Sequence, residues 1–170
     1  MMKKLLFVLP VFVCSTVFAV DGTVNFTGNV IGVACEVNPS SQVNNVKMGD
    51  ISSAIFNDVG DTAAPTRFEI AITGCDDSLQ KVNVRFDGPT DNNNSRLLAL
   101  SQGETAAKGL AIALYEDDAT TLIPLASASK SKDLEGGAAT LSYVAKYMAT
   151  ADSVTTGSAN ATTNFTLSYN

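Results

Sequence analysis

Alternation of apolar and polar residues with a period of two dominates this chain after residue 19. Apolar side chains at every second position lie on one face of an extended strand. Turn-rich stretches such as 87–95 and 135–137 separate the alternating segments. Repeated short strands of this kind predict an all-β chain, a β-sandwich with an immunoglobulin-like plan. The alternating positions are Phe68, Ile70 and Ile72; Val82, Val84 and Phe86; Leu110, Ile112 and Leu114; Leu141, Tyr143, Ala145 and Tyr147; and Phe165, Leu167 and Tyr169.

Residues 1–19 have the features of a secretory signal peptide. Lys3 and Lys4 provide the positive start, an apolar run follows over 5–13, and small residues precede a cleavage point after Ala19. The apolar run is too short to cross a bilayer as a helix. We therefore expect an exported mature chain of residues 20–170, long enough for one domain.

The charge of the mature chain argues against nucleic acid as a partner. The full chain has a formal charge of −6, and removing the two signal lysines makes it −8. An acidic surface repels nucleic acid and anionic membranes.

Cleavage of the signal removes Cys14 and leaves Cys35 and Cys75. An isolated pair in a small exported domain is typically a disulfide, the alternative being two buried free thiols. Closing a loop of this length stabilises a fold by roughly 4 kcal/mol on the chain-entropy model.

The two ends of the mature chain are both apolar strands. The segment 22–30 alternates Val24, Phe26 and Val30 with polar residues, and 165–169 ends the chain with no strand after it. An apolar strand at the end of a chain is a pairing site for another molecule unless a neighbour covers its outer edge. We therefore expect the beginning of one chain to complete the end of another.

These features resemble the fimbrial (pilin) subunits of the chaperone–usher pathway, and type 1 fimbrial major subunits in particular. The resemblance lies in Gly-Thr-Val-Asn-Phe-Thr-Gly at 22–28, in Cys35, in Cys75 within Thr-Gly-Cys-Asp, and in the central strand at 109–115. The C-terminal segment adds the family's tail signature of a glycine, alternate apolar residues and a penultimate tyrosine. These residues are Gly157, Phe165, Leu167 and Tyr169.

The resemblance implies an incomplete immunoglobulin-like β-sandwich that lacks its last strand, completed by a donor strand from a neighbouring subunit. Residues 20–30 would be the donor-strand extension, and 31–170 the pilin domain. Val24, Phe26 and Val30 would fill pockets of the groove, and Gly28 would pass where the groove is tight.

The resemblance also implies partners and a location. A periplasmic chaperone would hold the C-terminal groove strand and the terminal carboxylate of Asn170, and an outer-membrane usher would assemble the subunits. The subunits would form a homopolymer, a fimbria on the bacterial cell surface that supports adhesion.

Two departures from the family pattern leave the role in the fibre open. Val20 and Asp21 give a short lead before the donor motif, as in adaptor or minor subunits, and Thr163 occupies a place where an apolar residue is common. The alternatives are therefore a shaft subunit, a minor or adaptor subunit, and a freestanding periplasmic or secreted β-sandwich binding protein.

Catalytic and metal chemistry have little support in the sequence. The chain contains no histidine, which excludes Ser–His and Cys–His catalysis and histidine-based metal sites. The acidic pairs at 76–77 and 116–118 are interpreted as solvated charge, and 91–95 lacks the spacing of an EF-hand. The sequence predicts no enzyme and no cofactor.

The tyrosines have two interpretations. Aromatic side chains stack on sugars in carbohydrate sites, yet Tyr143 and Tyr147 share one face of a strand with other apolar residues. We therefore expect them in the core, together with Tyr115.

Overall fold

The computed structural model describes residues 24–27, 35–42 and 44–170. The chain divides into two compact units, Met1–Ile31 and Gly32–Asn170. In the first unit, residues 24–27 have no regular secondary structure. The strands and helices below all belong to the second unit.

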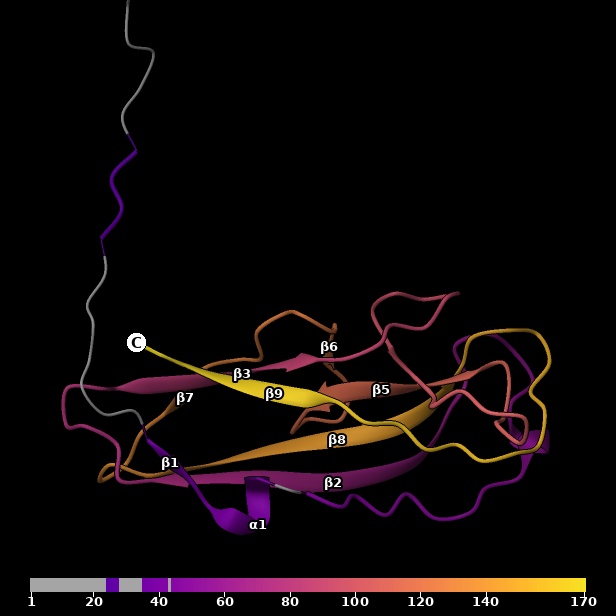
Figure 1. Ribbon diagram of the computed structural model, residues 1–170, viewed down its shortest axis with the longest axis horizontal. Coiled ribbons are helices and arrows are strands. Elements are labelled where there is room, and N and C mark those ends of the chain that lie inside the picture. The colour runs from indigo at the N-terminus through magenta and orange to yellow at the C-terminus, as the bar shows by residue number, and fades with distance from the viewer. Residues whose placement is uncertain (1–23, 28–34, 43) are drawn as a thin grey trace, which may run out of the picture. The chain divides into compact units, whose positions relative to one another are not determined.

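The second unit is a sandwich of two antiparallel sheets (Figure 1). The larger sheet has the order β1-β2-β8-β5-β4, with β6 also paired to β5, and the smaller has the order β7-β3-β9. The larger sheet contains β1 (Glu36–Val37), β2 (Thr62–Thr73), β4 (Leu98–Ala99), β5 (Leu110–Glu116), β6 (Leu122–Ile123) and β8 (Ala139–Ala149). The smaller contains β3 (Lys81–Asp87), β7 (Lys132–Asp133) and β9 (Asn164–Tyr169).

Helical structure in the described residues consists of short turns. The helix α1 spans Pro39–Gln42, and the 3₁₀ turn η1 spans Ser53–Ile55. No helix among the described residues is long and apolar enough to span a membrane.

The alternating segments of the sequence form the central strands, as predicted. Ile70 of β2 pairs with Leu141 of β8, and Ile112 of β5 pairs with Tyr147 of β8. A bulge interrupts β2 between Ala63 and Thr66, where the strand contains a proline. A bulge accommodates proline because the ladder hydrogen bond is already missing there.

The core lies between the sheets and is centred on aromatic contacts. The Phe86 and Tyr143 rings pack edge to face with centroids 5.2 Å apart, and Phe68 lies 5.7 Å from Tyr143. Tyr143 and Tyr147 are buried in this core, which confirms their interpretation as packing residues.

The strand β5 departs from the expected half-buried pattern. Every one of its residues is buried. Its second face packs in a separate cluster with Leu97 and Val144. The alternation in the sequence did not predict this cluster because Ala111 and Ala113, on that face, are too small to mark an apolar strand face by themselves.

Candidate functional site

The last strand, β9, lies at the open edge of the smaller sheet. It pairs with β3 so that Val84 faces Leu167 and Phe86 faces Phe165. Val84 and Phe86 are 0% and 2% exposed, whereas their partners on β9 are only half-buried. The apolar side chains of β3 are therefore fully covered, whereas those of the neighbouring strand β9 are only partly covered.

The backbone of β9 presents hydrogen-bonding groups at this edge. Asn170 and Lys81 exchange both of their backbone hydrogen bonds, at 3.0 and 3.1 Å. In an antiparallel ladder such pairs alternate with pairs that do not bond each other. The N–H and C=O groups of Phe165, Leu167 and Tyr169 therefore point away from β3, towards the open edge.

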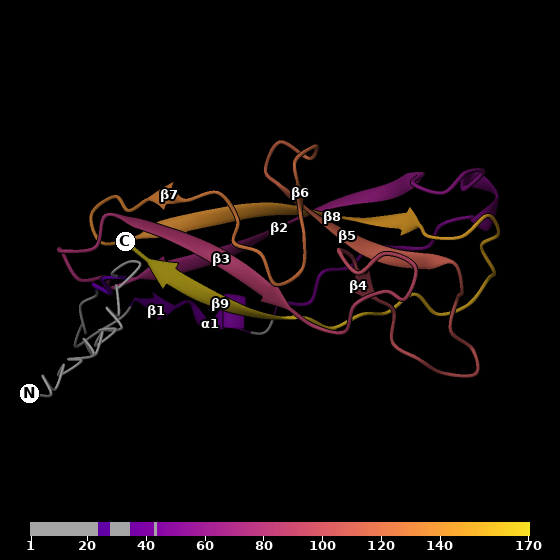
Figure 2. The ribbon, with the colours of Figure 1, turned by 90° about the horizontal axis from the view of Figure 1, so that it is seen from above.

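A groove of about 700 Å³ lies along this edge. Its walls are the segment from Cys35 to α1 and the first part of β9. The ribbons of β1, α1 and β9 are labelled in Figure 2. The side chains around it are a mixture of apolar and polar groups. They belong to Cys35, Glu36, Val37, Pro39, Gln42, Thr163, Asn164 and Phe165.

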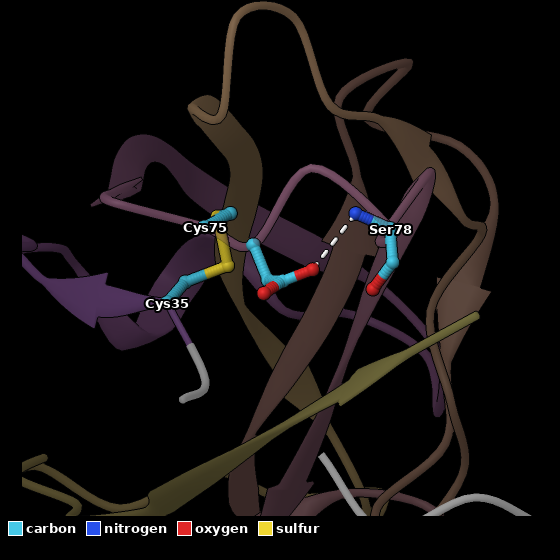
Figure 3. The surroundings of a disulfide bond; sticks show 4 residues. Cys35, Cys75 and Ser78 are labelled. Carbon is cyan, nitrogen blue, oxygen red and sulfur yellow. Dashed lines mark hydrogen bonds between the residues drawn. A yellow bond between two sulfur atoms is a disulfide. The ribbon is translucent and has the colours of Figure 1, made fainter. Parts of the chain in front are cut away.

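The predicted disulfide is formed and holds one wall of the groove. Cys35 lies directly before β1 and is bonded to Cys75, just after β2, with 4.1 Å between their Cα atoms (Figure 3). The strand β1 has two residues, Glu36 and Val37, which pair with Thr73 and Ile72. So short a strand provides little pairing energy, and the covalent link fixes its place together with the hydrogen bond from Asn38 N–H to Ala71 O at 2.9 Å.

The turn after the disulfide is stabilised by its own polar contacts. The backbone N–H of Ser78 donates to Asp76 Oδ1 at 2.9 Å (Figure 3). Hydrogen bonds from the Ser78 side chain and backbone hold the pKa of Asp76 below its ordinary value.

Tyr169 is the last residue of β9 and is half-buried. Burial raises the pKa of the Tyr169 hydroxyl, and a hydrogen bond to the Cys35 backbone partly opposes that rise.

Gly157 lies seven residues before β9, in the connection from β8. A Cβ at this position would lie 2.5 Å from Ala107 N and 2.5 Å from Thr105 O. Ser158 makes backbone hydrogen bonds with the same two residues, at 2.7 and 3.0 Å. Glycine is needed here because the connection passes directly against another backbone, which fixes where β9 begins.

The remaining predicted site residues are placed as follows. Asn170 is exposed and extends the β9 pairing by one residue. Val24 and Phe26 are 76% and 93% exposed in the first unit. Gly28 and Val30 lie outside the described residues.

The wall formed by β1 and α1 was not predicted from the sequence. A signal for it exists in Asn38-Pro39, because an asparagine cap followed by proline is typical of a helix start. The Asn38 side chain indeed accepts the backbone N–H of Ser40 at 3.0 Å.

The acidic segments considered for catalysis or for metal binding have structural roles. Glu116 is buried, contrary to its interpretation as solvated charge, and its Oε1 accepts the Lys130 backbone N–H at 2.6 Å. Asp91 accepts the backbone N–H groups of Asn93 and Asn94 within its own turn. Among the described residues, no group of three or more acidic or cysteine side chains is arranged to hold a metal ion.

Comparison with known proteins adds family evidence to this geometry. A family model described as "Fimbrial protein" matches residues 24–170. A probable major fimbrial subunit, LpfA of Escherichia coli O157:H7, is 38% identical over 99% of this chain and 97% of the relative. The rod subunit PapA of the P pilus is 25% identical, with a TM-score of 0.67 over 81% of this chain and 100% of that chain. A subunit from the structure of a chaperone–usher pilus is 25% identical, with a TM-score of 0.66 over 92% of this chain and 100% of that chain.

Proposed function

This chain belongs to the fimbrial protein family and is a structural subunit of a bacterial surface fimbria, and we propose that it polymerises by donor-strand exchange. In this mechanism the segment 20–30 of one copy fills the groove beside β9 of the next copy. The subunit is exported through the periplasm to reach the cell surface.

One observation carries the proposal: the unequal burial of paired residues on β3 and β9. Phe165 and Leu167 face the core but are half-buried, and their backbone groups point to the open edge. The groove beside them therefore offers both an apolar surface and a row of donors and acceptors. An extended strand with alternating apolar side chains satisfies both needs at once.

The segment 20–30 has the chemistry of that missing strand. Val24 and Phe26 are both strongly exposed, an unfavourable state for two apolar side chains two residues apart. Burying Val24, Phe26 and Val30 in a neighbour's groove would contribute about 1.5–3 kcal/mol for each side chain. Backbone hydrogen bonds along β9 would add about 1 kcal/mol apiece.

The same geometry accounts for a durable fibre. Withdrawal of the donor strand would again expose Phe165 and Leu167 and leave the backbone edge of β9 without its partner strand. Dissociation would then be limited by the barrier to opening the sandwich, so the stability of the polymer would be kinetic as well as thermodynamic.

The proposal includes assembly partners. Before polymerisation, a periplasmic chaperone covers the β9 edge and binds the terminal carboxylate of Asn170, and an outer-membrane usher joins the subunits. The support for these partners is the similarity to a subunit of a chaperone–usher pilus and the exposed position of Asn170.

We assign the chain to the shaft of the fibre and give it no catalytic role. The similarity to a probable major fimbrial subunit over nearly its whole length supports the shaft assignment over an adaptor role. The absence of histidine from the sequence and the structural role of the family support a purely structural protein.

The proposal is tested by supplying the donor strand within one chain. A second copy of residues 20–30 is joined after Asn170 through a short flexible linker, and the original 20–28 are deleted. We expect a monomer that does not polymerise and that unfolds at a higher temperature than the mature subunit, because its groove is filled. The measurements are size-exclusion chromatography and thermal unfolding.

A matched control carries the same extension with Val24→Ser and Phe26→Ser in the added copy. Its thermal stability should fall back to that of the unfilled subunit. If the two extended chains are equally stable, or if the chain without 20–28 still forms polymers, the groove does not accept this segment and the proposal is wrong.

A further inference from the structure

Large apolar side chains are exposed at two places among the residues that the structure describes. Val24 and Phe26 belong to the donor segment, and Ile55 and Val59 belong to the loop that leads from η1 to β2. Ile55 is 48% exposed and Val59 is 57% exposed. The proposed donor-strand exchange buries the first two side chains. The other two, which we call the apolar pair, stay exposed in a single copy.

The loop that carries the apolar pair is firmly attached to the sandwich. Asp61 Oδ2 accepts two backbone N–H groups of the loop, at 2.8 and 3.0 Å. Gly60 N–H donates to Ala149 O, and Ala149 N–H donates to Asp61 O, both at 2.9 Å. Phe56 is 7% exposed and anchors the loop in the core. The pair is therefore held in a fixed position, which lowers the entropic cost of binding a partner.

The apolar pair and the disulfide lie at opposite ends of the sandwich. The loop leads into β2 at Thr62, and Cys75 lies just beyond the other end of that strand. A strand of 12 residues is about 40 Å long. Figure 1 shows the purple loop before β2 and the C-terminus at opposite ends of the sandwich. We call the two ends the loop end, residues 53–61, and the disulfide end, residues 74–80.

The proposed donor strand places a neighbouring copy against the loop end. Every strand pair in the described residues is antiparallel. The C-terminus lies at the disulfide end, where Gln80 N–H donates to Asn170 O at 3.0 Å. An antiparallel donor therefore starts beside that end, and its residues 20–30 extend about 36 Å towards the loop end. Cys35 of the donating copy follows within about 18 Å of its Val30, so the body of that copy lies beside the loop end.

The antiparallel arrangement uses each end of a copy once. The loop end of one copy meets the disulfide end of the copy that donates to it. Its own disulfide end meets the loop end of the copy to which it donates. A heterologous contact of this kind repeats along a fibre without closing. A parallel donor would instead bring two neighbours to the disulfide end of every copy.

The chemistry of the two ends favours an apolar contact between them. The loop end exposes Asp58 beside Val59, and the disulfide end exposes Asp76 and Asp77. Like charges repel, so the attraction between these ends is not electrostatic. The turn at the disulfide end also contains Leu79, which is half-buried and supplies an apolar side chain.

We propose that Ile55 and Val59 form the contact surface for the body of the neighbouring copy and pack against residues 74–80 of that copy. This inference rests on the donor-strand function proposed above. The contact couples consecutive subunits in addition to the donor strand. It holds them in one relative orientation, so the fibre is stiffer than a series of domains joined by donor strands alone.

The first test locates the partner of the apolar pair by photocrosslinking. Mature chains with Val59→p-benzoylphenylalanine are assembled into fibres and irradiated, and mass spectrometry identifies the linked peptides. We expect links to residues 74–80, which belong to a neighbouring copy because the two ends of one copy are too far apart. Thr120→p-benzoylphenylalanine, at an exposed position between β5 and β6, is the control and should give no such link. If the probe at position 59 also gives no link to 74–80, the inference is overturned.

The second test separates the apolar pair from the groove. A peptide of residues 20–30 competes with whole chains for the grooves of full-length mature chains, and light scattering measures the peptide concentration that halves the mean fibre length. For the variant with Ile55→Ser and Val59→Ser we expect this concentration to fall about tenfold. The whole chain loses its body contact in this variant, whereas the peptide never makes that contact.

The serine variant should fold, because both side chains are exposed and the hydrogen bonds of the loop come from other residues. The variant with Ile55→Val and Val59→Ile is the matched control. It keeps the apolar surface and should require the same peptide concentration as the wild-type chain.

The outcomes separate this inference from the proposed function. If the serine variant and the wild-type chain require the same peptide concentration, the apolar pair makes no contact between copies and the inference is overturned. If the serine variant binds the isolated peptide more weakly in native mass spectrometry, the pair belongs to the groove and the inference is also overturned. If the wild-type chain does not bind the peptide and polymers form without residues 20–28, the donor-strand function itself is overturned.

Discussion

Val84 and Leu167 are direct partners across the β3–β9 ladder, yet Val84 is completely buried and Leu167 is half-buried. The difference arises because β3 is covered on both sides. One edge of β3 pairs with β9. At its other edge, Ser129 N–H donates to Val84 O and Ala126 N–H donates to Phe86 O, both at 2.8 Å. The outer side of β9 is bounded instead by the groove.

Leu167→Ala should therefore affect the filled subunit more than the unfilled one. In the mature subunit we expect a loss of about 1–2 kcal/mol of unfolding free energy, because the side chain is half-buried. In the chain with the donor strand added after Asn170 we expect about 2–5 kcal/mol, the cost for a fully buried leucine. Urea denaturation of both chains measures the difference.

Val84→Ala provides the control, since Val84 is buried in either state. Its cost should be the same in the filled and unfilled chains. Equal costs for Leu167→Ala in both chains would mean that the added strand does not cover β9.

The longer strands β2, β3, β5, β8 and β9 were predictable because each one carries its own alternating signal. Ile70, Val84 and Leu141 fall on the inward faces at the positions that the period of two required. The disulfide was predictable for a different reason, since an exported chain with one remaining cysteine pair leaves a single possible pairing.

The groove walls were less predictable because their positions depend on contacts between distant segments. Glu36 and Val37 show no strand pattern of their own, and their place is set by the disulfide and by pairing with the end of β2. Gly157 was noted from the family signature, but its physical reason is a close approach to Thr105 and Ala107, about 50 residues away in the sequence.

Loss of the disulfide should both destabilise the subunit and open the groove. Cys35→Ser removes the closure of a loop with a sequence separation of 40, for which we expect a loss of roughly 4 kcal/mol. Cys75→Ser should have the same effect, and the double variant should be no worse than either. Urea denaturation and periplasmic yield test this, and unchanged stability would show that the bond has no structural role.

Gly157→Ala should destabilise the subunit by about 2–4 kcal/mol. The added Cβ would lie 2.5 Å from backbone atoms of Thr105 and Ala107, and backbone atoms cannot move aside as the end of a flexible side chain can. Gly103→Ala is the control: no atom lies within 4 Å of a Cβ at that position. Thermal unfolding should separate the two variants. A Gly157→Ala chain as stable as the control would contradict the close approach.

The stability of the subunit should fall at high pH through Tyr143. Burial raises the pKa of Tyr143 to about 12, a rise opposed by its hydrogen bond with Ser129 and supported by the nearby Glu116 carboxylate. The folded state thus favours the neutral phenol. Its contribution is complete below the ordinary value of about 10 and is lost as the pH rises from about 10 to about 12.

Tyr143→Phe removes this ionisation and should make the unfolding free energy less dependent on pH in that range, by a few kcal/mol at most. The hydroxyl's partner Ser129 keeps its hydrogen bond from the Val84 N–H at 3.0 Å, so the variant should fold. A residual pH dependence is expected because burial also raises the pKa values of Tyr115 and Tyr147. Urea denaturation across this pH range measures the effect, and parallel curves for the wild-type and Tyr143→Phe chains would show that Tyr143 is not the group responsible.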